Sequence, residues 1–220
     1  MNAKVGVRWL ASLLIFAAAL LAAQGARANT LTIYNTGVDN SGTPLSGGSA
    51  DPHYTDTYLG PPSGSTNPAV VMTNENNFVG GWAQASDAKW INCIDSFYGY
   101  SYGSYDYRIT FDLTGYDPST ATLSGKWTCD DDGSINLNGV ATGISLGYGS
   151  WGSLYNFTIN SGFVAGTNTL DFLIVEGTGI DGLLVSDSSL MATTVPIPAA
   201  LPIFGSGLVG LLVWRRFRKS

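Results

Sequence analysis

Residues 105–113 read Tyr-Asp-Tyr-Arg-Ile-Thr-Phe-Asp-Leu, and this stretch decides the fold class. Apolar or aromatic residues alternate with polar ones along the whole stretch. Successive side chains of a strand point to opposite faces, so the pattern predicts a strand that is buried on one face and solvated on the other. The buried face would carry Tyr105, Tyr107, Ile109, Phe111 and Leu113.

Shorter segments of the same character lie on both sides of this strand, separated by turn residues. Asn138-Gly139 is a strong signal for a tight hairpin turn. The body is rich in Gly, Ser, Thr, Asn, Asp and Tyr, a composition that disfavours helices. The sequence therefore predicts an all-β protein with a single β-sandwich or jelly roll. The other predicted strands are 31–35, 69–72, 121–129, 134–137, 154–159, 169–175 and 182–191.

The N-terminus has the three parts of a secretory signal. Lys4 and Arg8 precede an apolar stretch over 9–23, and Ala26-Arg27-Ala28 supplies a small-x-small cleavage pattern. This order predicts a signal peptide over residues 1–28 that is removed after Ala28 during export through the Sec translocon.

The C-terminus carries a second targeting segment. A Val195-Pro196-Ile197-Pro198 motif precedes an apolar run over 199–214. As a helix this run is about 24 Å long, which is short for a hydrocarbon core of about 30 Å. A basic stretch follows and would stay on the cytoplasmic side, leaving the body outside. Its members are Arg215, Arg216, Arg218 and Lys219. A plain tail anchor is the alternative interpretation.

This order of motif, short apolar helix and basic end resembles the PEP-CTERM sorting signal of Gram-negative bacteria, with Ile197 at the place of the family's Glu. The resemblance implies that an exosortase cuts near 195–198. It also implies a precursor held in the inner membrane and a mature form at the cell surface or in the extracellular matrix of a biofilm. The predicted organisation is a signal peptide over 1–28, a β-sandwich over 29–194 and a sorting signal over 195–220.

Charge limits the possible partners. The chain has 10 basic and 16 acidic residues, a net charge of −6. Between the two targeting segments only three basic residues remain beside all 16 acids, which gives the body a net charge of −13. Such a body repels phosphate backbones, so nucleic-acid binding is disfavoured.

Three stretches of the body resemble galactose-binding-like sandwich domains. Residues 127–139, WTCDDDGSINLNG, form an acidic turn, a strand and an Asn-Gly turn. Residues 162–172 contain a Gly-x-Asn-x-Leu entry into a late strand, and residues 182–186 fit the closing strand. The resemblance implies a jelly-roll fold in which carbohydrate binding is common.

An aromatic segment is the first candidate binding site. Tyr98, Tyr100 and Tyr102 recur at every second position in a Gly/Ser-rich segment. An extended backbone would place the three rings on one face, where they could stack on the C–H faces of sugars, and Trp82 could add a fourth ring. The alternative is that these residues belong to an ordinary sandwich strand and its core.

An acidic cluster is the second candidate. Asp130, Asp131 and Asp132, with Asn136 nearby, offer hard oxygen ligands that suit Ca²⁺. An EF-hand loop is excluded because its sixth position would be Ile135. A solvated Asp-rich turn and direct hydrogen bonding to sugar hydroxyls are the alternatives. No other cofactor is predicted.

Cys93 and Cys129 are the only cysteines of a chain predicted to be exported. In an oxidising compartment such a pair predicts a disulfide. The bridge would contribute about 4 kcal/mol through the chain entropy of the unfolded state.

No motif marks a catalytic centre. His53 is the sole histidine and is expected in a loop, and no particular pair of acids is marked for glycoside hydrolysis. The sequence therefore predicts a non-catalytic protein that binds or organises extracellular polysaccharide. Two alternatives stay open: a purely structural or adhesive matrix protein without specific glycan binding, and a secreted glycan hydrolase.

Overall fold

A computed structural model describes residues 27–60, 66–73, 81–93, 103–177 and 181–195. The predicted signal peptide, apart from its last two residues, and the sorting segment from Pro196 onward lie outside the described residues. Ala28–Thr193 form one compact unit. Within the described ranges, no helix has the length and apolar character needed to cross a membrane.

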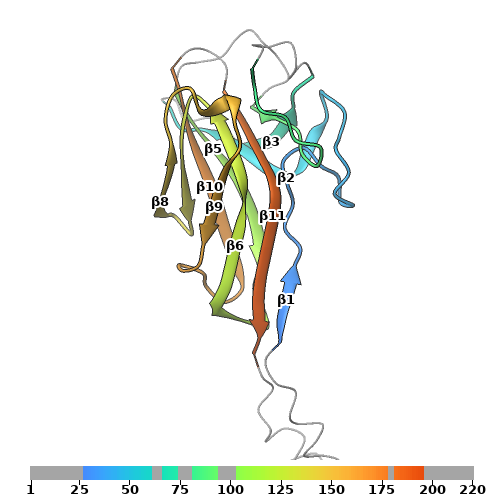
Figure 1. Cartoon of the computed structure of the whole chain (residues 1–220), viewed down its shortest axis with the longest axis vertical. Coiled ribbons are helices and arrows are strands. Elements are labelled where there is room, and N and C mark those ends of the chain that lie inside the picture. Colours follow the sequence, from blue (N-terminus) through green and yellow to red (C-terminus); the bar gives the residue numbers. More distant parts are fainter. Residues whose placement is uncertain (1–26, 61–65, 74–80, 94–102, 178–180, 196–220) are drawn as a thin grey trace, which may run out of the picture. The chain divides into compact units, whose positions relative to one another are not determined.

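The described part of this unit is all-β apart from one short 3-10 turn, as the sequence predicts (Figure 1). Its elements are β1 (Ala28–Leu31), β2 (Ala50–Tyr58), β3 (Thr66–Val71), β4 (Ile91–Asn92), β5 (Gly103–Asp112), β6 (Tyr116–Asp130), β7 (Asp132–Leu137), β8 (Val140–Leu146), η1 (Ser150–Gly152), β9 (Tyr155–Ile159), β10 (Thr167–Glu176) and β11 (Gly182–Thr194).

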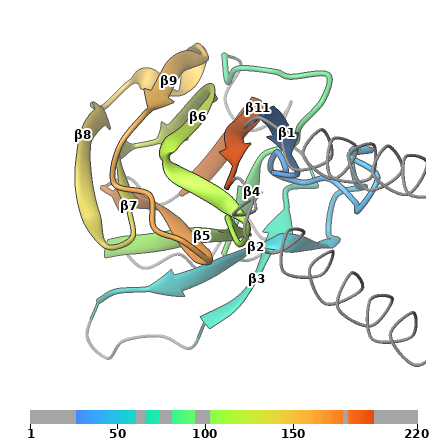
Figure 2. The same cartoon turned by 90° about the horizontal axis from the view of Figure 1, so that it is seen from below.

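The strands form one continuous hydrogen-bonded sheet that curls into two facing layers (Figure 2). The strand order is β8-β7-β10-β5-β2-β3-β4-β11-β6-β9, and β1 pairs with β11. The first six strands of this order make one layer. Strands β11, β6 and β9, together with β1, make the other. All pairings with a printed register are antiparallel, so the architecture is a β-sandwich.

Strand β5 lies where the alternating sequence places it, and its predicted inner face is confirmed. All five residues of that face are buried. They pack against the inner faces of β10 and β6, where Phe172 and Trp127 have no exposed surface. Burying a side chain of this size stabilises the fold by about 1.5–3 kcal/mol. The apolar positions of the alternating segment are thus the residues that form the core.

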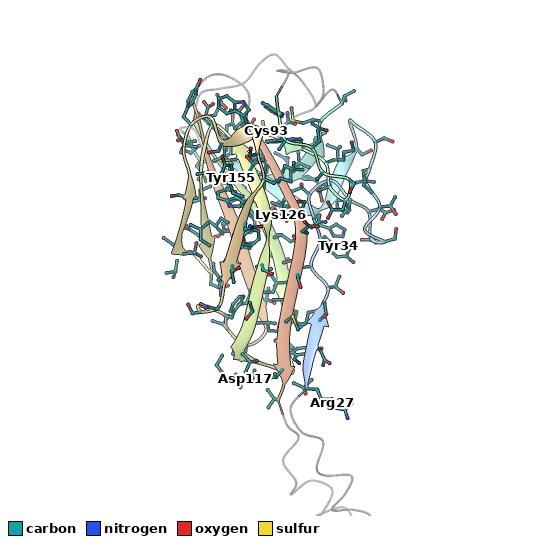
Figure 3. The ribbon with its side chains drawn as sticks, in the orientation of Figure 1. Arg27, Tyr34, Cys93, Asp117, Lys126 and Tyr155 are labelled. Atoms are coloured by element: carbon teal, nitrogen blue, oxygen red, sulfur yellow. The ribbon has the colours of Figure 1, made fainter. Side chains whose placement is uncertain are left out.

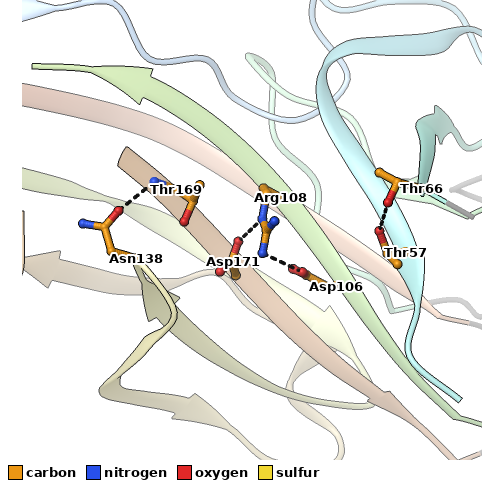
Figure 4. Close-up of polar contacts among 7 residues, drawn as sticks. All are labelled: Thr57, Thr66, Asp106, Arg108, Asn138, Thr169 and Asp171. Atoms are coloured by element: carbon orange, nitrogen blue, oxygen red, sulfur yellow. Dashed lines mark hydrogen bonds and ion pairs between the residues drawn. The ribbon is translucent and has the colours of Figure 1, made fainter. Parts of the chain in front are cut away.

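The Asn138-Gly139 turn is also confirmed. It joins β7 and β8, and both residues have positive φ, 53° and 75°. A two-residue hairpin of type I′ requires this backbone, which Asn and Gly adopt at low cost. The Asn138 side chain adds two bonds to the neighbouring strand region: its Oδ1 accepts from the Thr169 amide at 3.0 Å (Figure 4), and its Nδ2 donates to Asn168 at 2.9 Å.

Several segments differ from the prediction: β4 and β8 are strands that the sequence does not predict, and the first strand and the segment around His53 also differ. The first strand covers Ala28–Leu31 rather than 31–35. Beyond Leu31 the backbone leaves the sheet, and a carbonyl there bonds to a side chain instead of to a neighbouring strand. The Tyr34 carbonyl accepts from the Tyr54 hydroxyl at 3.1 Å. His53 lies in strand β2 rather than in a loop, with its ring stacked on that of Tyr34 at 3.5 Å.

The sandwich has two distinct ends. At the terminal end, β1 and β11 pair with Ala28 opposite Thr193, and the Thr193 hydroxyl lies 2.8 Å from that of Thr120 on β6. Thr128, eight residues further along β6, marks the loop end. At the rise of a β-strand these two positions on β6 are about 26 Å apart.

Candidate functional site

The connection between β8 and β9 carries exposed aromatic rings at the loop end. Tyr148 is 67% exposed, and its ring meets that of Trp151 edge to face with the centroids 5.1 Å apart. We call these two residues the aromatic corner. Tyr155, the first residue of β9, is exposed as well and lies toward the same end (Figure 3). Sequence reasoning missed Tyr148.

Hydrogen bonds from three directions hold the backbone of the aromatic corner. The Thr128 hydroxyl on β6 donates to the Ser150 carbonyl at 2.8 Å. The Ala83 amide donates to the Trp151 carbonyl at 2.8 Å. The Ser150 hydroxyl donates to the Gly147 carbonyl at 2.6 Å, closing the turn. A ring on such a fixed turn loses little conformational freedom when a ligand binds, which favours affinity.

Asp132 places a carboxylate beside this turn. It is the exposed first residue of β7, and its Oδ1 lies 3.7 Å from where a Cβ on Gly147 would be. Exposed aromatic faces with an adjacent hydrogen-bond acceptor are what a sugar ring needs: C–H groups stack on the rings, and hydroxyls donate to the carboxylate. Asp132 is thus the member of the predicted acidic cluster that lies at the aromatic corner.

Of the predicted aromatic platform, only Trp82 belongs to the described residues. Tyr98, Tyr100 and Tyr102 lie outside the described residues. The strands that flank them reach the loop end, where Gly103 is paired with Glu176. Trp82 corrects the prediction: it is 5% exposed, and its ring packs on that of Trp90 at a centroid distance of 4.2 Å. Trp82 is buried in a small hydrophobic cluster with Met72, Ala88, Trp90 and Leu184. It therefore cannot offer a surface to a sugar.

The predicted calcium ligands do not converge. Asp130 and Asp131 are buried, whereas Asp132 is exposed and Asn136 lies on the outer face of β7. The Asp131 carboxylate accepts from the Gly177 amide at 3.0 Å. In the part of the chain that the structure describes, no three His, Cys, Asp or Glu side chains are grouped as a metal ion requires. The calcium interpretation of this set is therefore corrected.

The two cysteines are free thiols, so the predicted disulfide is also corrected. They lie on different elements with different partners: the Cys93 thiol donates to Asp181 at 3.5 Å, and the Cys129 thiol contacts the Asp131 carbonyl at 3.8 Å. Burial raises the pKa of both thiols, and neighbouring aspartates raise it further. A thiol held protonated in this way is a poor nucleophile.

Buried carboxyl groups gather inside the sandwich near the loop end. Asp56, Asp130 and Asp181 are 4%, 6% and 0% exposed. Burial raises the pKa of Asp56 to about 7, helped by the charges of Asp181 and Asp106. Burial also raises the pKa of Asp130 to about 9, helped by its hydrogen bond with Asp131. We call Asp56, Asp130 and Asp181 the buried acids.

Asp181 has hydrogen bonds that oppose the effect of burial. Its pKa is raised by burial to about 6, while hydrogen bonds from Tyr107 and Cys93 act in the lowering direction. No polysaccharide can reach three carboxyls that are this deeply buried. They therefore do not form the accessible acid pair that glycoside hydrolysis needs.

Comparison with known proteins gives only remote likenesses. No protein-family model matches the chain. No curated protein matches it either. The CBM36-1 domain of a multidomain xylanase, from the hindgut metagenome of Trinervitermes trinervoides, is similar at 9% identity and a TM-score of 0.29. That match covers 79% of this chain and 100% of that one. CBM35 from Paenibacillus barcinonensis is similar at 17% identity and a TM-score of 0.30, covering 58% and 88% of the two chains. Scores this low establish no shared function.

Proposed function

We propose that the body is a non-catalytic module that binds extracellular polysaccharide through the aromatic corner. The observation that carries this proposal is the exposed Tyr148 ring, set edge to face against Trp151 on a turn fixed by hydrogen bonds. A tyrosine ring this exposed contributes little buried surface to the stability of the fold, and its faces are open to a ligand. Sugar rings are the neutral, partly apolar ligands that fit such a surface on an acidic protein.

We further propose that the protein is exported through the Sec translocon and sorted through its C-terminal segment by an exosortase. The register of β1 and β11 bears on where the two predicted processing points lie in the chain. Ala28, after which the signal peptide would be cut, lies opposite Thr193, two residues before the Val195-Pro196-Ile197-Pro198 motif begins. Ala28 and Thr193 therefore lie together at the terminal end of the body, away from the aromatic corner.

The location of the mature protein follows from the same proposal. The precursor is held in the inner membrane by residues 199–214, with the basic stretch on the cytoplasmic side. After cleavage the body reaches the cell surface or the extracellular matrix. Intact mass of the protein from membrane and medium fractions tests this. An N-terminus at Asn29 and a C-terminus within 196–200 support it, whereas a chain that still ends at Ser220 contradicts it.

Glycan binding is tested with the exported protein on a glycan array, followed by affinity electrophoresis in gels that contain the host's polysaccharide. Tyr148→Ala is expected to weaken retardation by about fivefold or more, because one stacked ring contributes on the order of 1 kcal/mol. Val140→Ala is the matched control, since Val140 is 68% exposed but lies in the β7–β8 hairpin. Equal retardation of wild type and Tyr148→Ala contradicts this site.

The alternative that stays in view is a structural or adhesive matrix protein without specific glycan binding. It predicts that no glycan on the array is retained and that neither Tyr148→Ala nor Val140→Ala changes any interaction. The array therefore separates the two functions in one measurement.

A further inference from the structure

Most of the body's positive charge is already neutralised by its own carboxylates. Arg108 Nε lies 2.6 Å from Asp171 Oδ1, and Arg108 Nη2 lies 3.2 Å from Asp106 Oδ2 (Figure 4). Lys126 Nζ lies 2.8 Å from Asp187. Arg108 and Lys126 are thus ion-paired within the body, and between residues 29 and 198 the 16 acids far outnumber the three basic residues, so acids dominate the surface field.

The aromatic corner has its own acid. The Asp132 carboxylate is exposed and lies against the turn that carries Tyr148. An ammonium group on a bound sugar could pair with this carboxylate while the sugar ring lies against the Tyr148 ring. The same ammonium is attracted to the negative face of an aromatic ring. A uronate at the same place would meet like charge from Asp132 and from the body as a whole.

We propose that the aromatic corner selects polysaccharides that carry free amino groups, such as incompletely N-acylated hexosamine polymers, over acidic polysaccharides. This inference rests on the proposed glycan-binding function and names its ligand class. Three features carry it: the exposed ring of Tyr148, the carboxylate of Asp132 beside it, and the net charge of −13 around them. Neutral sugars satisfy the first feature and use the carboxylate only as an acceptor for hydroxyl hydrogen bonds, without a charge pair.

The test compares a glucosamine hexamer, its fully N-acetylated counterpart and an oligogalacturonate by titration calorimetry on the exported protein. The amino hexamer is expected to bind best and to weaken as salt is raised, because exposed charge pairs are screened. Asp132→Asn should weaken binding of the amino hexamer by about two- to fivefold, the range of an exposed ion pair, and leave the acetylated hexamer unchanged. Asp117→Asn is the control, a partly exposed acid toward the terminal end (Figure 3).

Each outcome separates the inference from the function on which it rests. If the amino and acetylated hexamers bind equally and Tyr148→Ala weakens both, the selectivity is overturned while glycan binding stands. Preferential binding of the oligogalacturonate also overturns it. If none of the three ligands nor any glycan on the array binds, glycan binding itself is wrong and the selectivity falls with it. Circular dichroism of Asp132→Asn checks that the variant is folded.

Discussion

Tyr107 donates its hydroxyl hydrogen to Asp181 inside the sandwich near the loop end, and neither side chain has any exposed surface. The two residues are on different elements, Tyr107 within β5 and Asp181 just before β11. A buried carboxyl that loses a hydrogen-bond donor keeps its desolvation cost without compensation. This hydrogen bond therefore links β5 to the segment before β11 and partly offsets the free energy of desolvating the Asp181 carboxyl.

The first prediction concerns that bond. Tyr107→Phe removes the donor without changing the ring, so the free energy of unfolding should fall by about 1–3 kcal/mol. The pKa of Asp181 should rise further, because the lost hydrogen bond acts to lower it. Urea denaturation measures the first effect. Tyr148→Phe on the exposed ring is the control and should leave the unfolding midpoint unchanged.

The second prediction concerns pH. The folded-state pKa values of Asp56, Asp130 and Asp181 are about 7, 9 and 6, all above the ordinary value of 3.8. The native state thus binds more protons than the unfolded state between about pH 4 and pH 9, and stability falls as pH rises through that window. The Tm should be several degrees higher at pH 5 than at pH 8.

A variant tests the origin of that slope. Asp130→Asn keeps the shape of the protonated carboxyl and removes its titration, so the loss of stability between pH 7 and pH 9 should become smaller. The pKa values of Asp39, Asp112 and Asp117 are lowered by hydrogen bonds from nearby hydroxyls and amides. Because these three pKa values are lowered, stability falls as pH drops below about 4, which is the opposite pH dependence to that of the buried acids. A Tm that rises from pH 5 to pH 8 would contradict the assignment.

The third prediction concerns Gly133 in the inner face of β7. A Cβ at this position would lie 2.6 Å from Cys129 Sγ and 3.1 Å from the Trp127 ring. Overpacking of a core in this way costs about 1–3 kcal/mol, so Gly133→Ala should be destabilising by that amount. Cys129→Ala in the same chain should recover much of the loss, since it removes the nearest atom. Ser134→Ala, on the outer face of β7, is the control.

The fourth prediction concerns the thiols. Because Cys93 and Cys129 are unbridged, the unfolded and unreduced protein should take up two alkyl groups from an excess of iodoacetamide. The folded protein should react slowly, since burial keeps both thiols protonated. Mass spectrometry counts the adducts. A protein that takes up two groups only after reduction would show that a disulfide forms in the host.

The sequence predicted those parts of the fold that depend on local pattern. Alternation over 105–113 identified β5 and its inner face, and Asn138-Gly139 identified the β7–β8 turn. Strand β2 was missed because its inward row contains Asp56, a polar residue at a core position. Only the tertiary structure shows that this carboxyl is buried near those of Asp181 and Asp106.

The candidate site was harder to predict, because exposure is decided by packing between distant segments. Trp82 and Trp151 are alike in sequence context, yet Trp82 is covered by Trp90 and Trp151 reaches the surface beside Tyr148. The available signal was the run Gly147-Tyr148-Gly149, an aromatic residue between two glycines in a turn. The disulfide prediction differs from the structure because the export compartment shows only that cysteines can oxidise, whereas both thiols here are free and contact other groups.

The pairing of β1 with the end of β11 has a mechanical consequence. If the body is held at its C-terminus and a bound polymer pulls on the loop end, as proposed above, tension runs along the length of β11. That strand runs over Gly182–Thr194 and lies hydrogen-bonded between β6 and its shorter partners β1 and β4. Hydrogen bonds perpendicular to the pull are then loaded all together in shear rather than opened one after another. If the proposed C-terminal anchoring and glycan binding both hold, this arrangement would resist pulling along β11.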